Sequence, residues 1–231
     1  MNSLTSRLTA SPITARVAPF AVFIILTFLQ GHFGEAGRYW IYLAKTLLAA
    51  WMLRVVWPVV SEMRWKVSWE AIVVGVSVFA LWVGLDDLLI RLGLANSYPK
   101  ARLTGTAWNP HEMFGHASAL AWFFIVVRIA GSSLVVPALE EVFFRSFLYR
   151  YLVKVDFLSV PLSTFAWRPF LITAVIFGFE HREWLAGILC GFAYQGLVCW
   201  KQRLGDVMTA HAITNFLLGV WVVWRGAWQF W

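Results

Sequence analysis

The chain consists mainly of long apolar runs separated by short polar connections. Eight runs are candidate membrane-spanning helices, close to the ~20 residues that such a helix needs, and they cover residues 17–33, 39–57, 69–90, 113–130, 133–155, 170–181, 184–200 and 207–224. The fourth and sixth runs are short or interrupted by polar residues, so seven spans also fit the pattern. The pattern predicts an all-α fold, a polytopic membrane helix bundle of about eight transmembrane helices.

The longest polar connection, residues 91–112, divides what we expect to be a single membrane domain over 1–231. Residues 1–112 hold the N-terminal spans and this loop, and residues 113–231 hold the remaining spans. The composition supports a membrane protein, because 60% of the residues are hydrophobic and 13% are charged. A soluble domain carries about 25% charged residues, and a disordered chain needs high charge and low hydrophobicity.

The net charge is +7, from 19 Lys and Arg against 12 Asp and Glu. The basic residues are scattered between apolar runs, which favours membrane lipid headgroups over nucleic acid as the partner. With eight alternating spans, one side would hold eight cations: Arg7, Arg16, Arg54, Arg64, Lys66, Arg128, Arg182 and Arg225. The other side would hold nine: Arg38, Arg91, Lys100, Arg102, Arg150, Lys154, Arg168, Lys201 and Arg203. Because the two sides are nearly balanced, the positive-inside rule does not predict the orientation of the chain in the membrane.

Three charged residues lie inside the fifth apolar run. Glu141 and Arg145 are four residues apart, so on a helix they share a face and can pair. Glu140 is rotated by about 100° from Glu141 and lacks that partner. An unpaired carboxylate is costly in apolar surroundings unless it takes up a proton, and such residues mark functional sites in membranes. For Glu141 and Arg145, a structural ion pair holding helices together is an equally good interpretation. Pro137 has no N–H and is expected to free the carbonyl four residues back.

Two histidines and an asparagine lie at a matching depth. At about 1.5 Å per residue, Glu140 is ~20 Å from the end of its span and His181 is ~16 Å from the start of its own. His211 and Asn215, on one helix face, are ~9 Å and ~15 Å from Gly205. If the spans alternate, these reference points lie on one side of the membrane. Each side chain taken singly fits a packing role, but together they predict one polar cavity near the midplane.

The chain resembles the CPBP intramembrane proteases, relatives of the type II CAAX prenyl endopeptidase, in three motifs with the family's order and spacing: Glu140-Glu141-x-x-x-Arg145, Phe177-x-x-x-His181 and His211-x-x-x-Asn215. The resemblance covers residues 134–224 and implies that residues 113–231 form a CPBP-like catalytic core. Two N-terminal segments are similar to the prenyl-protease-related subfamily that accompanies bacterial exosortase sorting systems: Val78-Phe79-Ala80-Leu81-Trp82-Val83-Gly84-Leu85-Asp86 and Trp108-Asn109-Pro110.

The resemblance implies an intramembrane protease, a CAAX-type hydrolase, in the cell membrane as a multi-pass protein. Its substrate would be a membrane-anchored protein or peptide that is prenylated or carries a sorting signal. Glu140 would be the general base that activates water, and His181 would hold that water with it. His211 and Asn215 would stabilise the oxyanion of the tetrahedral intermediate, and the Glu141–Arg145 pair would shape the site.

The sequence leaves the cofactor and a rival function open. Glu140, His181 and His211 are candidate ligands for a divalent metal such as zinc, whose catalytic sites keep one position open. A metal-free glutamate mechanism uses the same residues, so no metal is assigned. Buried Glu and His residues also occur in transporters and proton relays, and a catalytically silent binding partner is a further alternative. The internal repeats that many transporters show are not visible in this sequence.

Overall fold

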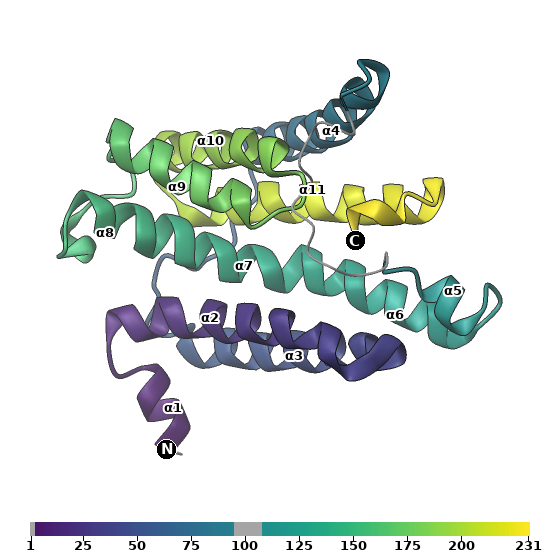
Figure 1. Ribbon diagram of the computed structural model, residues 1–231. Helices are drawn as coiled ribbons and strands as arrows, with labels where there is room; N and C mark the ends of the chain where they lie inside the picture. The colour runs from purple at the N-terminus through teal and green to yellow at the C-terminus, as the bar shows by residue number, and fades with distance from the viewer. Residues whose placement is uncertain (1–2, 95–107) are drawn as a thin grey trace.

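The computed structural model describes residues 3–94 and 108–231, and every regular element in those two stretches is helical. Figure 1 shows the helices packed roughly parallel and antiparallel, with α7 in the middle. The first half contains α1 (Ser3–Leu8), α2 (Pro12–Gln30), η1 (Gly31–Phe33), α3 (Gly34–Val56) and α4 (Trp69–Arg91). The second half contains α5 (Pro110–Phe114), α6 (Ala119–Ala130), η2 (Gly131–Val135), α7 (Val136–Glu141), η3 (Val142–Leu148), α8 (Tyr149–Val153), η4 (Phe157–Ser159), α9 (Trp167–Phe179), α10 (Trp184–Lys201), α11 (Leu204–Arg225) and η5 (Trp228–Phe230). The predicted all-α fold is confirmed.

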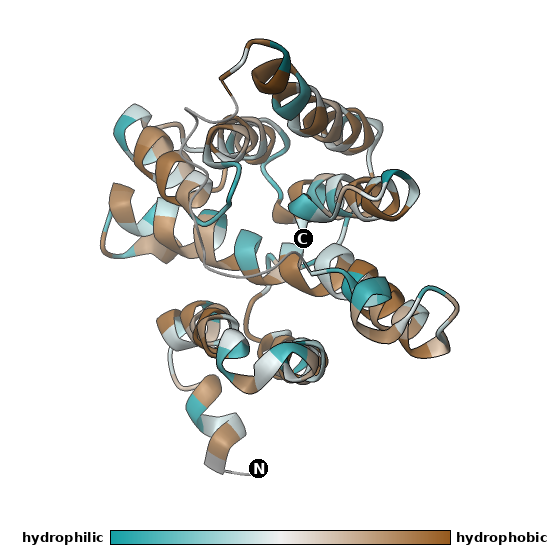
Figure 2. Cartoon of the chain, turned by 45° about the vertical axis from the view of Figure 1, so that its right-hand side comes forward, coloured by the Kyte–Doolittle hydropathy of each residue, from teal (hydrophilic) through white to brown (hydrophobic). Residues whose placement is uncertain are grey.

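Among the described residues, four helical stretches are long and apolar enough to cross a membrane: Pro12–Val56, Trp69–Arg91, Ala119–Val153 and Leu204–Arg225. The first contains both α2 and α3, which pack side by side as a hairpin. Hydrophobic residues run along the helices (Figure 2), and large apolar side chains such as Phe28 and Val126 are exposed. The interior holds an apolar core and, in addition, charged side chains, among them Glu141 and Arg145. Exposed apolar side chains together with charged groups that face the interior are the arrangement expected of a bundle in lipid.

The fourth and fifth candidate spans, 113–130 and 133–155, do not form two separate helices. Ala119–Val153 is one continuous helical stretch that runs through α6, η2, α7, η3 and α8. The expected break at residues 131 and 132 and the proline at position 137 both fall within this stretch. The backbone accommodates them by widening into π-helical turns at η2 and η3, which keep the helix continuous. Hydropathy cannot detect this, because it registers the polar residues and not the register of the backbone hydrogen bonds.

A buried ionic cluster ties several elements together at one end of the bundle. Glu62, in the connection between α3 and α4, accepts from Arg16 Nη2 at 2.7 Å and from Arg150 Nη2 at 2.8 Å. The Ser146 hydroxyl also donates to the same carboxylate oxygen. The start of α2, the α3–α4 connection and the end of the central helix therefore meet here. We call this side of the bundle the Glu62 end.

The connection between α10 and α11 lies at the Glu62 end as well. Lys201 at the end of α10 pairs with Glu70 in the first turn of α4 at 2.7 Å. The Ser68 hydroxyl, which caps α4, donates to Asp206 in the first turn of α11 at 2.6 Å. These contacts bring the starts of α4 and α11 together.

An aromatic cluster marks the opposite end of the bundle. The ring of Trp108 lies 4.5 Å from that of Tyr39 and 5.6 Å from that of Trp231, measured between centroids. The Arg128 guanidinium lies 4.7 Å from the Trp108 ring and 5.4 Å from the Trp231 ring. The start of α3, the helix α6 and the C-terminal residues therefore meet at what we call the Trp108 end.

The Glu62 cluster predicts a pH-dependent contribution to stability. Burial raises the pKa of Glu62, but the hydrogen bond from Ser146 and the charge of Arg16 outweigh burial and hold the pKa below its ordinary value. Glu62→Gln should destabilise the protein by ~3 kcal/mol at pH 7, because it leaves Arg16 and Arg150 without their shared anion. The measurement is thermal unfolding in detergent.

The sign of the pH dependence follows from the lowered pKa. A carboxylate with a depressed pKa in the folded state stabilises fully above its unfolded pKa of ~4.3 and loses this contribution as the pH falls through the folded pKa. The difference in Tm between wild type and Glu62→Gln should therefore shrink below about pH 4. Glu35→Gln, at an exposed position near the Trp108 end, is the control and should change Tm little. A Tm difference that stays constant down to low pH would contradict this account.

Candidate active site

A buried ion pair on the central helix forms the base of the site. Glu141 ends α7 and Arg145 follows one turn later in η3, with Arg145 Nε 3.1 Å from Glu141 Oε2. Both side chains are completely buried, at 0% exposure. The guanidinium lies over the ring of Phe177 on α9, 4.3 Å from its centroid. The i,i+4 pairing predicted for Glu141 and Arg145 is thus observed, and it also contacts a neighbouring helix.

Glu141 holds His211 from α11 with its other oxygen. His211 Nδ1 lies 2.9 Å from Glu141 Oε1, so the carboxylate accepts the Nδ1–H. This bond fixes the orientation of the imidazole ring and leaves Nε2 facing Glu140, 3.9 Å from its Oε2. That separation is too long for a hydrogen bond. Glu140 Oε2 is buried and has no hydrogen-bond partner in the described part of the chain.

His181 lies just beyond the end of α9, in the turn that leads to α10. Its Nδ1 donates to the carbonyl oxygen of Phe177 at 2.8 Å, and its ring packs edge to face on Trp82. The turn is held by a close approach of α9 and α10, where a Cβ on Gly187 would lie 2.9 Å from the Cα of Gly178. Any larger residue at position 187 would push the two helices apart and move His181.

Asn215 is anchored by an unpaired backbone carbonyl in the central helix. Its Nδ2 donates to the carbonyl oxygen of Ser132 at 2.8 Å. In η2 the N–H of Val136 bonds to the oxygen of Gly131, five residues back. In the same pattern, the N–H of residue 137 would bond to the oxygen of Ser132. That residue is Pro137, which has no N–H. Pro137 therefore frees the carbonyl five residues back, not four as an α-helix predicts, and Asn215 takes its place.

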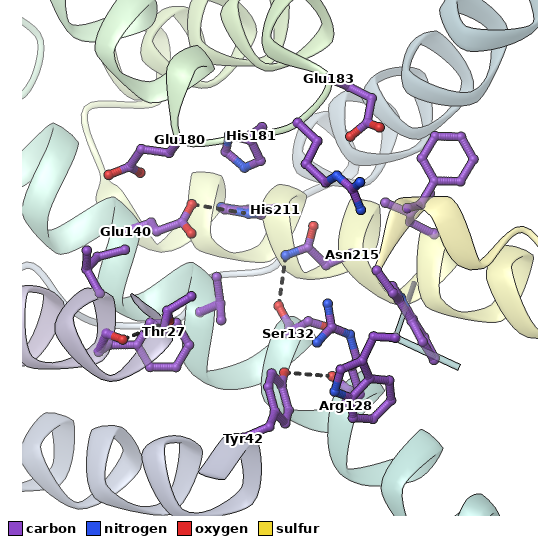
Figure 3. A pocket seen from close by; sticks show the side chains of 18 of the residues that line it. Thr27, Tyr42, Arg128, Ser132, Glu140, Glu180, His181, Glu183, His211 and Asn215 are labelled. Atoms are coloured by element: carbon purple, nitrogen blue, oxygen red, sulfur yellow. Dashed lines mark hydrogen bonds and ion pairs between the residues drawn. The ribbon is translucent and has the colours of Figure 1, made fainter. Parts of the chain in front are cut away.

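The structure brings Glu140, His181, His211 and Asn215 to a single cavity of about 450 Å³. Figure 3 shows the four side chains facing this space from three directions, with Glu180 beside Glu140. They come from α7, the α9–α10 turn and α11, as the shared depth predicted. A free carboxylate, two imidazoles with fixed orientation and a carboxamide therefore surround one space, which is a set of groups able to hold and activate a water molecule.

A family model described as Type II CAAX prenyl endopeptidase Rce1-like matches residues 116–217. These residues, a little under half of the chain, are similar to that family. A search of curated proteins and a search of solved structures gave no match. The family is one of CAAX proteases, and together with the four long apolar stretches of the described residues this similarity points to an integral membrane protein. The similarity to the exosortase-associated subfamily is finer than this match and stays a prediction.

The Rce1-like segment contains all three motifs, but the cavity extends beyond it. Lys45 on α3 and Trp82 on α4 also line the cavity and lie outside the matched residues. Sequence reasoning did not assign a role to Lys45, although a lysine inside the apolar run 39–57 was a visible signal. Trp82 gave no such signal, since an apolar aromatic residue in a span is expected for packing alone.

The donor set of the site resembles a metal site, and its spacing does not. His181 and His211 each use Nδ1 to bond a protein acceptor, which leaves a lone pair on Nε2 of the neutral ring, as in histidines that ligate metals. Within residues 3–94 and 108–231, however, no three His, Cys, Asp or Glu side chains lie close enough together to hold an ion. No step of the chemistry proposed below is therefore assigned to a metal.

The buried pair predicts a strong dependence of folding on Glu141. Glu141→Gln should destabilise the protein by roughly 3–5 kcal/mol, because it leaves the Arg145 guanidinium buried without its anion. Asp87→Asn is the matched control, since Asp87 pairs with Arg91 at the same i,i+4 spacing but both side chains are exposed. Exposed pairs contribute at most about 1 kcal/mol. Thermal unfolding in detergent measures both variants, and an equal loss in the two would refute the importance of the buried pair.

Proposed function

We propose that the protein is a multi-pass intramembrane endopeptidase of the cell membrane, which hydrolyses a peptide bond in a membrane-anchored protein or peptide with water activated by Glu140. The substrate is prenylated or carries a sorting signal. The observation that carries this proposal is the carboxylate of Glu140, whose Oε2 is buried without a hydrogen-bond partner among the described residues and which faces a cavity with two histidines and an asparagine. A general base needs this kind of setting, free of a permanent partner and shielded from bulk water.

Water activation follows from the free acceptors in the cavity. The hydrogen bond from His181 Nδ1 to the Phe177 carbonyl leaves Nε2 as an acceptor in the neutral ring. One water molecule can therefore donate to His181 Nε2 and to Glu140 Oε2. Glu140 takes the proton as the water oxygen attacks the peptide carbonyl, and it then delivers that proton to the leaving amine.

Stabilisation of the oxyanion falls to α11. Asn215 uses one Nδ2–H for the Ser132 carbonyl and has a second to offer. A neutral His211 has a single N–H, and Glu141 accepts it. His211 therefore donates from Nε2 only as an imidazolium, whose charge the Glu141 carboxylate stabilises. This arrangement gives the buried Glu141 a role next to the reacting atoms.

The test is cleavage of quenched fluorescent peptides, anchored to liposomes by a prenylcysteine or an apolar helix, by the reconstituted protein. Glu140→Gln keeps the size and hydrogen-bonding capacity of the side chain but removes the base. It should lower kcat by ~10²–10⁴, the usual contribution of a general base. Gel filtration and thermal unfolding in detergent should show an intact fold.

The control for this experiment is Glu112→Gln, an exposed carboxylate on α5, which should leave cleavage unchanged. Full turnover by Glu140→Gln would exclude the general-base role. Cleavage of equal rate in both samples that protease inhibitors abolish would come from a contaminating enzyme instead.

A further inference from the structure

Lys45 is a buried cation in the cavity wall that the proposed hydrolysis does not use. It lies on α3 with 4% of its surface exposed, and it lines the same cavity as Glu140. Its Nζ donates to the Thr27 hydroxyl at 2.7 Å and lies 4.6 Å and 5.1 Å from the ring centroids of Phe23 and Tyr42. Within the described stretches of the chain, no carboxylate lies within ion-pair distance of it.

The surroundings of Lys45 leave two of its three donors unused. An ammonium group has three N–H donors, and Thr27 accepts one of them. A role limited to joining α3 to α2 would need no charge, since a neutral donor would serve Thr27 equally well. A cation in apolar surroundings without an anion is costly, and the two aromatic rings supply only part of the stabilisation that an anion would give. The site is therefore built for an anion that the described protein residues do not supply.

The distance from Lys45 to the catalytic carboxylate can be estimated along the helices. The rings of Phe20 on α2 and Phe143 on η3 are stacked 4.2 Å apart, so these residues lie at one level. At a helical rise of 1.5 Å per residue, Thr27 lies about 10 Å closer to the Trp108 end than Phe20. Glu140 lies about 4 Å closer to that end than Phe143. The Lys45 site is thus about 6 Å beyond Glu140 along the bundle, which two extended peptide residues span.

We propose that Lys45 binds a carboxylate of the substrate two or three residues on the C-terminal side of the bond that is cleaved. This deepens the function proposed above and rests on it for the position of that bond. The carboxylate is either the α-carboxylate of a short C-terminal leaving peptide or the side chain of Asp or Glu at that position. Arg128 also lines the cavity, further toward the Trp108 end, and adds to the positive potential that draws an anionic peptide end inward.

The experiment measures binding, so it does not depend on turnover. Three dye-labelled apolar pentapeptides are compared by fluorescence anisotropy with the full-length Glu140→Gln protein in detergent: one with a free C-terminal carboxylate, one with a C-terminal amide, and one amide with Glu as its penultimate residue. The free acid should bind at least ~10-fold tighter than the plain amide, as a charge-assisted bond predicts. Recovery of tight binding by the Glu peptide would assign the site to side chains, and no recovery would assign it to the α-carboxylate.

Lys45→Met, added to the same protein, should abolish the preference for the acid and leave binding of the amide unchanged. Lys154→Met is the matched control, since Lys154 is exposed at the Glu62 end, and it should retain the preference. Equal affinity for acid and amide, including no binding of either, overturns the proposal, and so does a preference that survives Lys45→Met. If Lys45→Met does not fold, the binding of the three peptides to the parent protein still tests whether the cavity prefers a carboxylate. An acid preference that depends on Lys45 in a protein that cleaves nothing would refute only the proposed proteolysis.

A second observation, the distribution of cations between the two ends, bears on the compartment from which substrate arrives. Because Ala119–Val153 is one helix, the connection after α8 lies at the Glu62 end together with those after α3 and α10. Ten cations then belong to the Glu62 end: Arg7, Arg16, Arg54, Arg64, Lys66, Arg150, Lys154, Arg168, Lys201 and Arg203. Five of the described cations belong to the Trp108 end, namely Arg38, Arg91, Arg128, Arg182 and Arg225, while Lys100 and Arg102 lie outside the described residues.

The near-balance calculated for eight alternating spans thus becomes an excess at the Glu62 end. Three of the five described cations at the opposite end, Arg38, Arg128 and Arg182, line the cavity. The positive-inside rule places the more basic end in the cytoplasm. The cavity extends to the other end, where Gly31, Trp108 and Trp231 line it. None of the residues described for the connections at the Glu62 end contributes to its wall.

We infer that the cavity opens to the non-cytoplasmic side of the membrane, so that its substrate is a peptide segment presented from that side. This inference depends on the multi-pass arrangement and is independent of proteolysis. The test uses single cysteines at two exposed positions, Phe33→Cys near the Trp108 end and Val155→Cys at the Glu62 end, in intact cells treated with a membrane-impermeant maleimide. The parent protein, with Cys190 and Cys199, gives the background.

Phe33→Cys should react in intact cells, and Val155→Cys should react only after the membrane is opened. The reverse pattern overturns the inference, and so does equal reaction at both positions or no reaction of Phe33→Cys in intact cells. Reaction of the buried Cys190 identifies an unfolded sample. If the Phe33→Cys protein is unfolded, Gly31→Cys, at another exposed position near the same end, is used in its place.

Discussion

The arrangement of the site depends on one buried carboxylate, Glu141. One of its oxygens faces Arg145 on the same helix and the other accepts from His211 on α11. A carboxylate without exposure to water needs both partners, since an unpaired charge in this setting is very costly. The pair therefore fixes the rotation of the central helix and the position of α11 at the same time. It also determines where Glu140, the adjacent residue, must point.

The two neighbouring glutamates show how one helix separates structural from chemical tasks. Successive residues on a helix are rotated by about 100°, so Glu141 faces the bundle core while Glu140 faces the cavity. One oxygen of Glu141 accepts from His211 and the other lies in an ion pair with Arg145 but makes no hydrogen bond, while Glu140 Oε2 has no hydrogen-bond partner among the described residues. The contacts of Glu141 with Arg145 and His211 thus fix the position of Glu140 as well. Rigid support of a reactive group by residues that do not react is a general feature of catalytic sites.

Much of this could be predicted from sequence because it depends on helical periodicity and length. The Glu141–Arg145 pair follows from i,i+4 spacing, and the common depth of Glu140, His181 and His211 follows from the rise per residue. The continuity of Ala119–Val153 could not be predicted, because a π-turn leaves no mark in hydropathy. The partner of Asn215 depends on the same hidden register. Lys45 belongs to no motif, so only its position in the cavity wall gives it a role.

The π-helical turn at η2 has a consequence for how this segment can change in length. A π-turn holds one more residue than an α-turn, so η2 behaves as a one-residue insertion in an otherwise regular helix. Deletion of one residue there would restore α-helical bonding and rotate every residue on one side of η2 by about 100° relative to the other. Ser132 would then no longer meet Asn215 while Glu140 kept its place, or the reverse. The spacing between Ser132 and Glu140 is thus set by the backbone register of η2. Loss of a single residue there would separate the contact to Asn215 from the catalytic carboxylate.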